Sequence, residues 1–226
     1  LQAHDVAQRA LREVTIQSQI DSPHVVKIRD YGMRPDGHFY VLMDYVDGRQ
    51  LDEIHDFDEP MMPGRAVDII HQICQGLDEI HDKGIVHRDI KPGNIFIENH
   101  TQRALLIDFG LARKIMDDKG KHVSERKTAA FRGTHMYASA RSHDKLDLSR
   151  VDDLWSFVFV FVEMLTGQLP WREALKREDR PGIAKLKRRC FKNPTLLFDL
   201  PVAESFAPPP SSSSSSSSST HSDYDS

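Results

Sequence analysis

The 226-residue sequence predicts an α+β fold, in which short antiparallel hairpins accompany a mostly helical remainder. Residues 63–83 carry apolar side chains at helical spacing. Two pairs of short apolar runs, within residues 25–43 and 95–107, are each separated by turn residues and predict hairpins. The most apolar run, residues 154–165, is too short to span a bilayer and predicts a buried helix.

Composition places the chain among soluble globular proteins, because 39% of its residues are hydrophobic and 28% are charged. Its length allows a substantial core and one or two domains. The net charge of -4 does not by itself indicate a nucleic-acid partner. The polar opening Leu1–Asp5 does not resemble a signal peptide, and Cys74 and Cys190 do not make a disulfide framework. We therefore expect an intracellular protein, cytoplasmic or nuclear, with no nucleic-acid or membrane partner.

The first predicted elements are a helix and a hairpin. Residues 4–20 predict a helix, with Glu13 beside a stripe formed by Val6, Ala10, Val14 and Gln17. Strands are predicted at residues 25–31 and 38–43, because apolar residues run on both sides of the turn signal Pro35-Asp36-Gly37.

A longer helix is predicted over residues 63–83, and Gly84 provides its stop signal. Its apolar face is formed by Ala66, Ile69, Ile70, Ile73, Cys74, Leu77 and Ile80. We expect Cys74 to be a small core residue rather than a reactive thiol. His71 and His81 are expected to be ordinary polar-face residues, because no cysteine or carboxylate spacing suggests a metal site.

This helix leads through Ile85-Val86 to the most informative stretch, His87-Arg88-Asp89-Ile90-Lys91-Pro92-Gly93-Asn94. A second hairpin follows, with strands at residues 95–97 and 104–107, and ends at Asp108-Phe109-Gly110. Phosphoryl transfer needs a carboxylate that accepts the proton of the attacking hydroxyl, and oxygen ligands that hold magnesium against the phosphates. This stretch offers both, and the hairpin would hold Asn94 at one end and Asp108 at the other.

The two motifs resemble the catalytic loop H-R-D-x-x-x-x-N and the D-F-G tripeptide of eukaryotic protein kinases. Either motif alone could be an ordinary turn, but both stand here complete and in order. The resemblance implies a bilobal kinase-like fold with a partial N-lobe and a mostly helical C-lobe. It also implies that Asp89 is the catalytic base, that Asn94 and Asp108 bind magnesium, and that Lys91 is a cation near the transferred phosphate. The Lys-Pro-Gly-Asn continuation resembles the serine/threonine branch.

The resemblance extends to the N-terminal elements. The helix at residues 4–20 resembles the αC helix of kinases, which implies that Glu13 pairs with the lysine that anchors ATP. The second strand of the first hairpin would lead into the hinge between the lobes. Met43 would then guard the back of the adenine pocket, while Asp44 and Val46 would offer backbone groups to adenine.

Residues 108–141 resemble a kinase activation segment whose end departs from the usual Ala-Pro-Glu. The run Gly133-Thr134-His135-Met136-Tyr137-Ala138-Ser139 resembles G-T-x-R-Y-A-S of the casein kinase one group, and within it of the tau-tubulin kinases. Residues 150–156 and 167–171 fit the same group, so the similarity covers residues 12–201.

Several roles follow by position in that resemblance. Thr134 would bond near Asp89 and Lys91, and Asp153 would brace the backbone of the catalytic loop. A buried aspartate needs such a partner, because an unpaired one would be costly. Ser149 and Asp152 have the spacing of a helix capping box.

One departure concerns substrate choice. Met136 replaces the arginine that helps this group to bind already phosphorylated substrates, so we do not expect that preference. The stretch from Arg172 to Lys192 has nine basic and three acidic residues, and Lys187-Arg188-Arg189 within it could supply a substitute. A solvated helical face is the simpler interpretation. A regulatory hypothesis is that Arg88 pairs with a phosphate on Ser124 or Thr128.

The expected organisation is a remnant of a kinase N-lobe at residues 1–46, a C-lobe at residues 47–206 and a disordered proline- and serine-rich tail at residues 207–226. The sequence contains no Gly-x-Gly, and no strand before residue 4 carries an ATP-anchoring lysine. The chain also stops before the last helices of a kinase C-lobe. We therefore expect either a fragment of a longer kinase or a protein that lacks these parts.

The predicted function is a protein serine/threonine kinase that uses ATP and Mg²⁺ to phosphorylate protein substrates. The alternative is a catalytically impaired pseudokinase or scaffold, because positioning of the γ-phosphate would suffer without a glycine-rich loop. We expect the 226 residues alone to transfer phosphate poorly or not at all. A small-molecule phosphotransferase is disfavoured, because residues 133–139 and 153–156 resemble the peptide-docking region of protein kinases. The oligomeric state is not predicted.

Overall fold

The structure, a computed structural model, describes residues 3–117, 119–126 and 128–198. Helices and small antiparallel sheets make it up, which confirms the α+β class. The helices are α1 (Ala3–Gln17), α2 (Leu51–Ile54), α3 (Pro63–Asp82), α4 (Ala140–His143), α5 (Arg150–Thr166), α6 (Arg172–Lys176) and α7 (Arg180–Lys192), with short 3₁₀ turns at Pro92–Asn94 and Pro194–Leu197. The strands are β1 (Ile28–Met33), β2 (Phe39–Met43), β3 (Gly48–Gln50), β4 (Ile85–Val86), β5 (Ile95–Glu98), β6 (Ala104–Leu106) and β7 (Arg113–Lys114). The predicted tail at residues 207–226 lies outside the described residues.

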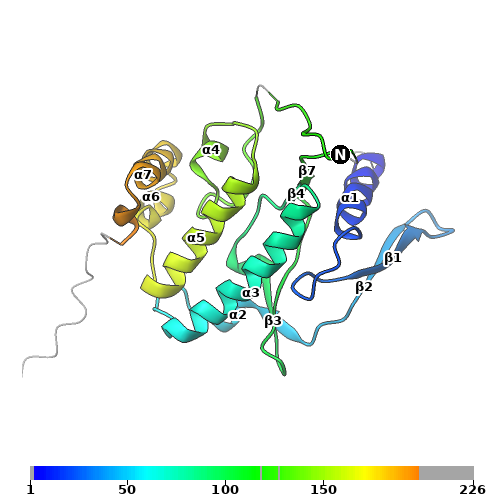
Figure 1. Cartoon of the computed structure of the whole chain (residues 1–226), viewed down its shortest axis with the longest axis horizontal. Helices are drawn as coiled ribbons and strands as arrows, with labels where there is room; N and C mark the ends of the chain where they lie inside the picture. Colours follow the sequence, from blue (N-terminus) through cyan, green and yellow to red (C-terminus); the bar gives the residue numbers. More distant parts are fainter. Residues whose placement is uncertain (1–2, 118, 127, 199–226) are drawn as a thin grey trace, which may run out of the picture.

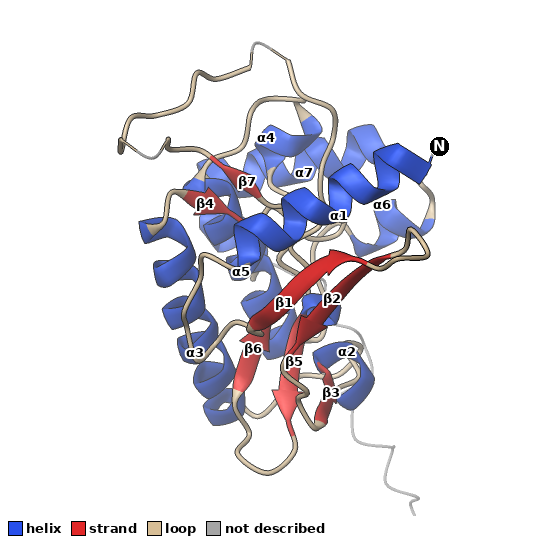
Figure 2. Cartoon of the chain, turned by 90° about the vertical axis from the view of Figure 1, so that its right-hand side faces the viewer, coloured by secondary structure: helices blue, strands red, loops and turns tan. Residues whose placement is uncertain are grey.

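Figure 1 shows α1 and the β1–β2 hairpin at one end of the molecule and α6 and α7 at the other. The hairpin forms as predicted, with register from Ile28 opposite Met43 to Met33 opposite Phe39. Figure 2 shows α1 lying along this hairpin. Of the predicted stripe on α1, Val14 and Gln17 are buried and Ala10 is half-buried, while the side chain of Val6 lies outside the described residues.

The second predicted hairpin forms two strands of a three-stranded sheet, in which β5 is the central strand. β5 pairs with β6, and β3, which the sequence did not predict, pairs with the other edge of β5. The backbone of Leu106 also bonds to residues of the N-terminal segment: its N–H donates to His24 O at 2.8 Å, and its carbonyl accepts from Val26 N at 3.2 Å. These bonds fix the N-terminal segment against the strand that leads to Asp108.

Helix α3 packs against β6 and α5 and forms much of the core. Every position of its predicted apolar face is buried except Cys74, which is exposed. The expectation of a core cysteine is therefore wrong. The neighbouring Ile73 is fully buried, so the core side of the helix is centred on Ile73 and leaves Cys74 at its edge.

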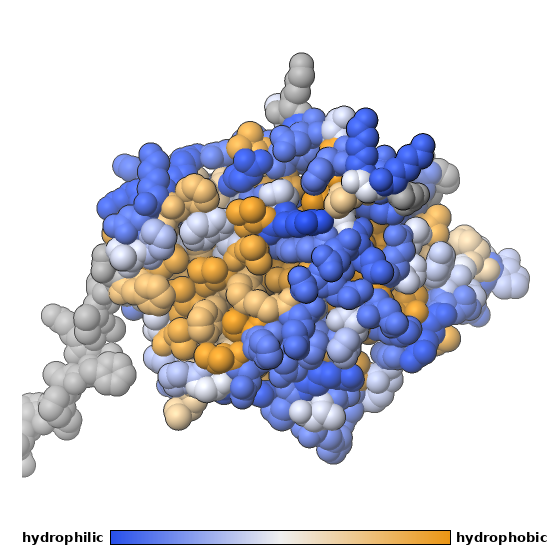
Figure 3. All heavy atoms as spheres, viewed as in Figure 1, coloured by the Kyte–Doolittle hydropathy of each residue, from blue (hydrophilic) through white to orange (hydrophobic). Residues whose placement is uncertain are grey.

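Helix α5 forms over the predicted apolar run, and Ser149 and Asp152 make the predicted capping box. The expectation of a buried helix holds for its second half, where Phe159, Val160 and Met164 are buried. Its first half exposes Val151 and Leu154, and Figure 3 shows apolar side chains gathered on this face, over α5. Among the described residues, no helix is both long and apolar enough to cross a membrane.

Candidate active site

A buried aspartate holds the backbone of the catalytic loop. Asp153, in the first turn of α5, is fully buried, and its carboxylate accepts the N–H groups of His87 at 2.8 Å and Arg88 at 2.7 Å. This is the bracing that the sequence predicted. The Nε2 atom of His81 lies 2.9 Å from the same carboxylate. His81 is therefore not an ordinary polar-face residue, because α3 turns it toward a buried acceptor.

Two left-handed backbone positions bring the catalytic loop against the activation segment. Arg88 has φ 69° and Gly133 has φ 90°. A Cβ atom on Gly133 would lie only 2.8 Å from the carbonyl oxygen of Arg88, so this close approach requires glycine. The left-handed Arg88 is a strained position of the kind that gathers at functional sites. The approach places Thr134 next to Asp89.

Four predicted catalytic side chains form one bonded cluster. Asp89 is buried; its Oδ1 accepts from Thr134 Oγ1 at 3.0 Å, and its Oδ2 lies 3.2 Å from Lys91 Nζ. Asn94 Nδ2 donates to the Asp89 carbonyl at 2.9 Å and to its carboxylate at 3.3 Å. A carboxylate fixed in this way, beside a cation, can accept a proton from a hydroxyl group.

Asp108 joins this cluster across the second hairpin. The N–H of Ile107 donates to Asn94 O at 3.0 Å, which fixes the two ends of the hairpin together. Asp108 itself has φ 62°, and its carboxylate accepts from Gly110 N at 3.1 Å. Asn94 and Asp108 line the same cavity.

The donor set at this place suits a hard cation. An amide oxygen and a carboxylate are ligands that Mg²⁺ accepts, and Mg²⁺ in such sites takes its other ligands from phosphates and water. Among the described residues, no group of three or more His, Cys, Asp or Glu side chains could hold a metal by itself. Asn94 and Asp108 thus fit a shared magnesium–nucleotide site rather than an all-protein metal cage.

Glu13 on α1 reaches the same region. A Cβ atom added to Gly110 would lie 3.3 Å from Glu13 Oε2 and 3.0 Å from Asp108 Oδ1, so the two carboxylates converge on this glycine. Burial, and then the charge of Asp108, raise the pKa of Glu13. Within the described part of the chain, Glu13 forms no ion pair. A cation between the two carboxylates would relieve their repulsion.

The predicted hinge residues lie apart from this cavity. Met43 ends β2 and is half-exposed, while Asp44 and Val46 line a separate hollow of about 470 Å³. The Asp44 carboxylate pairs with Arg29 at 2.5 and 2.8 Å, and this hydrogen bonding lowers its pKa. Asp44 and Val46 thus line a different hollow from the one lined by Asn94 and Asp108.

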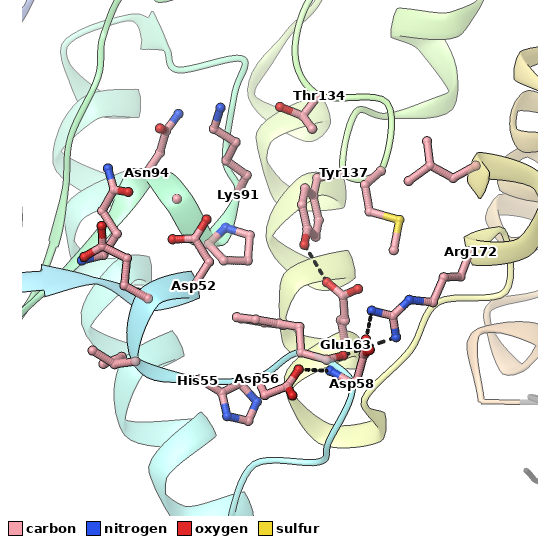
Figure 4. A pocket seen from close by; sticks show the side chains of 18 of the residues that line it. Asp52, His55, Asp56, Asp58, Lys91, Asn94, Thr134, Tyr137, Glu163 and Arg172 are labelled. Carbon is pink, nitrogen blue, oxygen red and sulfur yellow. Dashed lines mark hydrogen bonds and ion pairs between the residues drawn. The ribbon is translucent and has the colours of Figure 1, made fainter. Parts of the chain in front are cut away.

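The cavity that holds Lys91, Asn94, Asp108 and Thr134 has a volume of about 1120 Å³. Figure 4 shows its far side, where the hydroxyl of Tyr137 donates to Glu163 at 2.6 Å and Arg172 pairs with Asp58. Burial raises the pKa of both Tyr137 and Glu163. The pairing of Tyr137 with Glu163 was not predicted from the sequence, although the acidic Glu163 interrupts the apolar run of α5 and could have indicated it.

A second hollow, of about 1480 Å³, is lined by five arginines: Arg12, Arg88, Arg113, Arg126 and Arg132. Burial, and then the neighbouring Arg126 and Arg113, lower the pKa of Arg88 to about 10. Asp147 pairs with Arg113 and Arg126. The positive charge that remains makes this hollow attractive to an anion.

Comparison with known proteins extends these observations. The protein kinase domain family matches residues 2–219. The chain is 37% identical over 204 residues to a probable serine/threonine-protein kinase of Dictyostelium discoideum, covering 87% of this chain and 40% of that protein. It is 37% identical over 174 residues to the serine/threonine-protein kinase pkn2 of Myxococcus xanthus, covering 76% and 20%. It is also 37% identical over 135 residues to a casein kinase I-like protein of Caenorhabditis elegans, covering 58% and 40%. The chain thus spans less than half the length of each of these relatives.

Proposed function

The chain belongs to the protein kinase domain family and has its bilobal α+β fold, and on this premise we propose that it is a protein serine/threonine kinase. The reaction is transfer of the γ-phosphate of ATP to serine and threonine hydroxyls of protein substrates. The observation that carries the proposal is the bonded cluster of Asp89, Lys91, Asn94 and Thr134 beside Asp108. The names of the relatives, as serine/threonine-protein kinases, support the acceptor class.

The proposed roles follow from the chemistry of each group. Asp89 accepts the proton of the substrate hydroxyl, Thr134 and Asn94 keep its carboxylate in place, and Lys91 offers positive charge where phosphate charge develops. Asn94 and Asp108 would hold Mg²⁺, which when bound neutralises the phosphates. Glu13, Met43, Asp44 and Val46 would contribute to ATP binding, and residues 1–46 and 47–206 would be the N-lobe remnant and the C-lobe. An intracellular location, cytoplasmic or nuclear, belongs to the same proposal.

A closer kinship with the casein kinase one group, and with tau-tubulin kinases, is part of this proposal. It is supported by residues 133–139 and by the similarity to one casein kinase I-like protein. The hollow that contains Arg88 supports the regulatory hypothesis that a phosphate on Ser124 or Thr128 binds there. Unchanged activity after replacement of both residues with alanine would contradict that hypothesis.

A second candidate function, a pseudokinase or scaffold, is favoured by one observation. Glu13 forms no ion pair among the described residues, and it faces the Asp108 carboxylate instead of a lysine. A kinase domain in which no lysine binds the α- and β-phosphates holds ATP less precisely and transfers phosphate slowly.

The test is transfer of label from [γ-³²P]ATP with Mg²⁺ to casein, by the purified 226-residue chain. We expect slow transfer that Asp89→Asn reduces by about 10²- to 10⁴-fold, because a general base contributes that much. The matched control is Asp68→Asn, the same change at an exposed position of α3. Binding of Mg²⁺–ATP without transfer would favour the scaffold, equal transfer by Asp89→Asn would contradict the proposed base, and labelling of sugars or aminoglycosides instead of casein would contradict the substrate class.

A further inference from the structure

Lys187, in the middle of α7, is buried in a way that its sequence context does not suggest. Its side chain is 1% exposed, although it lies in the basic run Lys187-Arg188-Arg189. The basic run allows two interpretations, a solvated face or a phosphate site, and Lys187 fits neither. The neighbours Arg188 and Arg189 are exposed, as a solvated face requires.

The ammonium group of Lys187 uses its donors on one segment of backbone. Nζ donates to the carbonyl oxygens of His135 at 2.8 Å, Met136 at 2.9 Å and Ala138 at 2.5 Å. A lysine ammonium has three N–H donors, so these bonds occupy all of them. The group therefore has no donor left for a substrate phosphate.

Two aromatic rings complete the environment of this cation. Nζ lies 5.1 Å from the centroid of the Phe159 ring and 4.8 Å from that of Trp171. Among the described residues, no carboxylate forms an ion pair with Lys187, and burial lowers its pKa well below the ordinary value. Burial of an unpaired cation is costly, so carbonyl dipoles and ring faces must offset that cost.

The backbone segment to which Lys187 donates its hydrogen bonds forms one wall of the candidate active site. We call residues 134–138 the docking wall. Thr134, Met136 and Tyr137 line the cavity together with Lys91 and Asn94. Thr134 bonds to Asp89 at one end of this wall, and Tyr137 bonds to Glu163 further along it. Between these two anchors, the backbone is fixed by Lys187 and by Trp171, whose Nε1 donates to Met136 O at 2.8 Å.

We propose that Lys187 is a positioning residue for the protein substrate: its ammonium group holds the docking wall in the shape that a peptide meets beside Asp89. This inference rests on the proposed kinase function. Substrate binding at the wall depends on its shape, and a phosphate on the substrate is not needed there. Met136, in place of a basic residue, agrees with that expectation.

Lys187→Met tests the proposal, because methionine keeps an apolar stem against Phe159 and Trp171 but removes the three donors. Hydrogen exchange in the purified chain gives a readout that needs no catalysis. The N–H groups of Tyr137 and Ala138 bond to Thr134 O at 2.9 and 2.7 Å. We expect their exchange to become about tenfold faster or more in the variant, while the amides of α3 stay unchanged.

The second readout separates a positioning role from a merely structural one. For dephosphorylated casein, Lys187→Met should raise KM by about tenfold or more, with the KM for ATP unchanged. If turnover is too slow to measure, the Kd for dephosphorylated casein replaces KM. Lys187→Arg should restore much of the affinity, because arginine returns donors to the carbonyls. Lys185→Met, an exposed position on the same helix, is the matched control and should change neither readout.

The outcomes separate this inference from the function on which it rests. Unchanged exchange at Tyr137 and Ala138 would overturn it, and so would faster exchange with unchanged affinity for casein. A loss of affinity for phosphorylated casein alone would overturn it in favour of a phosphate site. Absence of Mg²⁺–ATP binding in the wild-type chain would count against the kinase function, while the exchange result would still decide whether Lys187 holds the wall. If Lys187→Met does not fold, Trp171→Phe, which removes the bond to Met136 O and replaces the ring beside Lys187 with a smaller one, should produce a smaller change in the same direction.

Discussion

The catalytic loop and the N-terminal hairpin are both short segments, but the structure holds them in different ways. In the loop, the charged and polar side chains are buried or half-buried and bond to distant parts of the chain, such as Asp89 to Thr134 and the loop backbone to Asp153. In the hairpin, the bonds are local, as between Tyr40 and Asp30, and apolar side chains such as Met33 and Leu42 are exposed.

This difference separates two sources of order. The turn of the hairpin and the register of its strands are both determined by a few neighbouring residues. The loop bonds to partners that lie 45 and 66 residues away in the sequence. It can therefore adopt this conformation only when α5 and the activation segment are folded against it. The geometry of this loop is therefore a property of the whole fold, and changes to distant partners should affect it most.

The largest effect is expected from Asp153→Asn. The amide would lose the charge and could no longer accept at both oxygens, so a buried N–H of the loop would lack a partner. We expect a loss of about 2–4 kcal/mol in the free energy of unfolding, measured with urea. Asp68→Asn, at an exposed position of α3, is the control and should cost less than about 0.5 kcal/mol. A small effect of Asp153→Asn would mean that the loop is held by its own sequence, as the hairpin is.

A smaller effect, dependent on pH, is expected from Asp147→Asn. Asp147 is buried and accepts from Arg126 N at 3.0 Å and from the guanidinium groups of Arg126 and Arg113. Burial alone would raise its pKa, but these donors outweigh burial and lower the pKa to about 2. The charged carboxylate is thus favoured in the folded state, and its contribution is present above its ordinary pKa of about 4 and is lost as pH falls through about 2.

At pH 7 this variant should lose about 1–3 kcal/mol of unfolding free energy in urea, because a buried ion pair is broken. At pH 2 the difference from the wild-type chain should become much smaller. If the variant loses the same unfolding free energy at both pH values, Asp147 stabilises the fold through its packing rather than its charge. The stability losses at pH 7 and pH 2 thus show whether long-range charge pairing fixes the activation segment. The catalytic loop, in contrast, is fixed by long-range hydrogen bonds.

The sequence was sufficient for elements whose signals are local. The two hairpins, the long helix α3 and the Ser149 capping box all form where a turn, a periodicity or a spacing within a few residues indicates them. The positions of Asp89, Asn94 and Asp108 could be predicted because a resemblance supplied the long-range arrangement. Periodicity alone would not have brought them together.

The predictions that were wrong concern residues whose burial depends on another element. His81 and Lys187 both sit where a helical pattern expects solvent. Helix α5 supplies Asp153 to His81, and Lys187 meets the ring of Phe159 on α5 and that of Trp171 just before α6. Cys74 shows the reverse, because the core is centred on Ile73 and leaves the cysteine exposed. A helical period gives the faces of a helix, but only the packing of the fold decides which face meets a partner.

The smallest effect is expected on the hairpin. Leu42 is 57% exposed on β2, so Leu42→Ser should change the free energy of unfolding by less than about 0.5 kcal/mol, measured with urea at two protein concentrations. The reason is that little apolar area of Leu42 is buried in the folded chain, so its replacement by serine removes little apolar burial. A loss above about 1 kcal/mol that grows with protein concentration would mean that this face is covered by a second copy. The hairpin would then share the dependence on distant partners that distinguishes the catalytic loop.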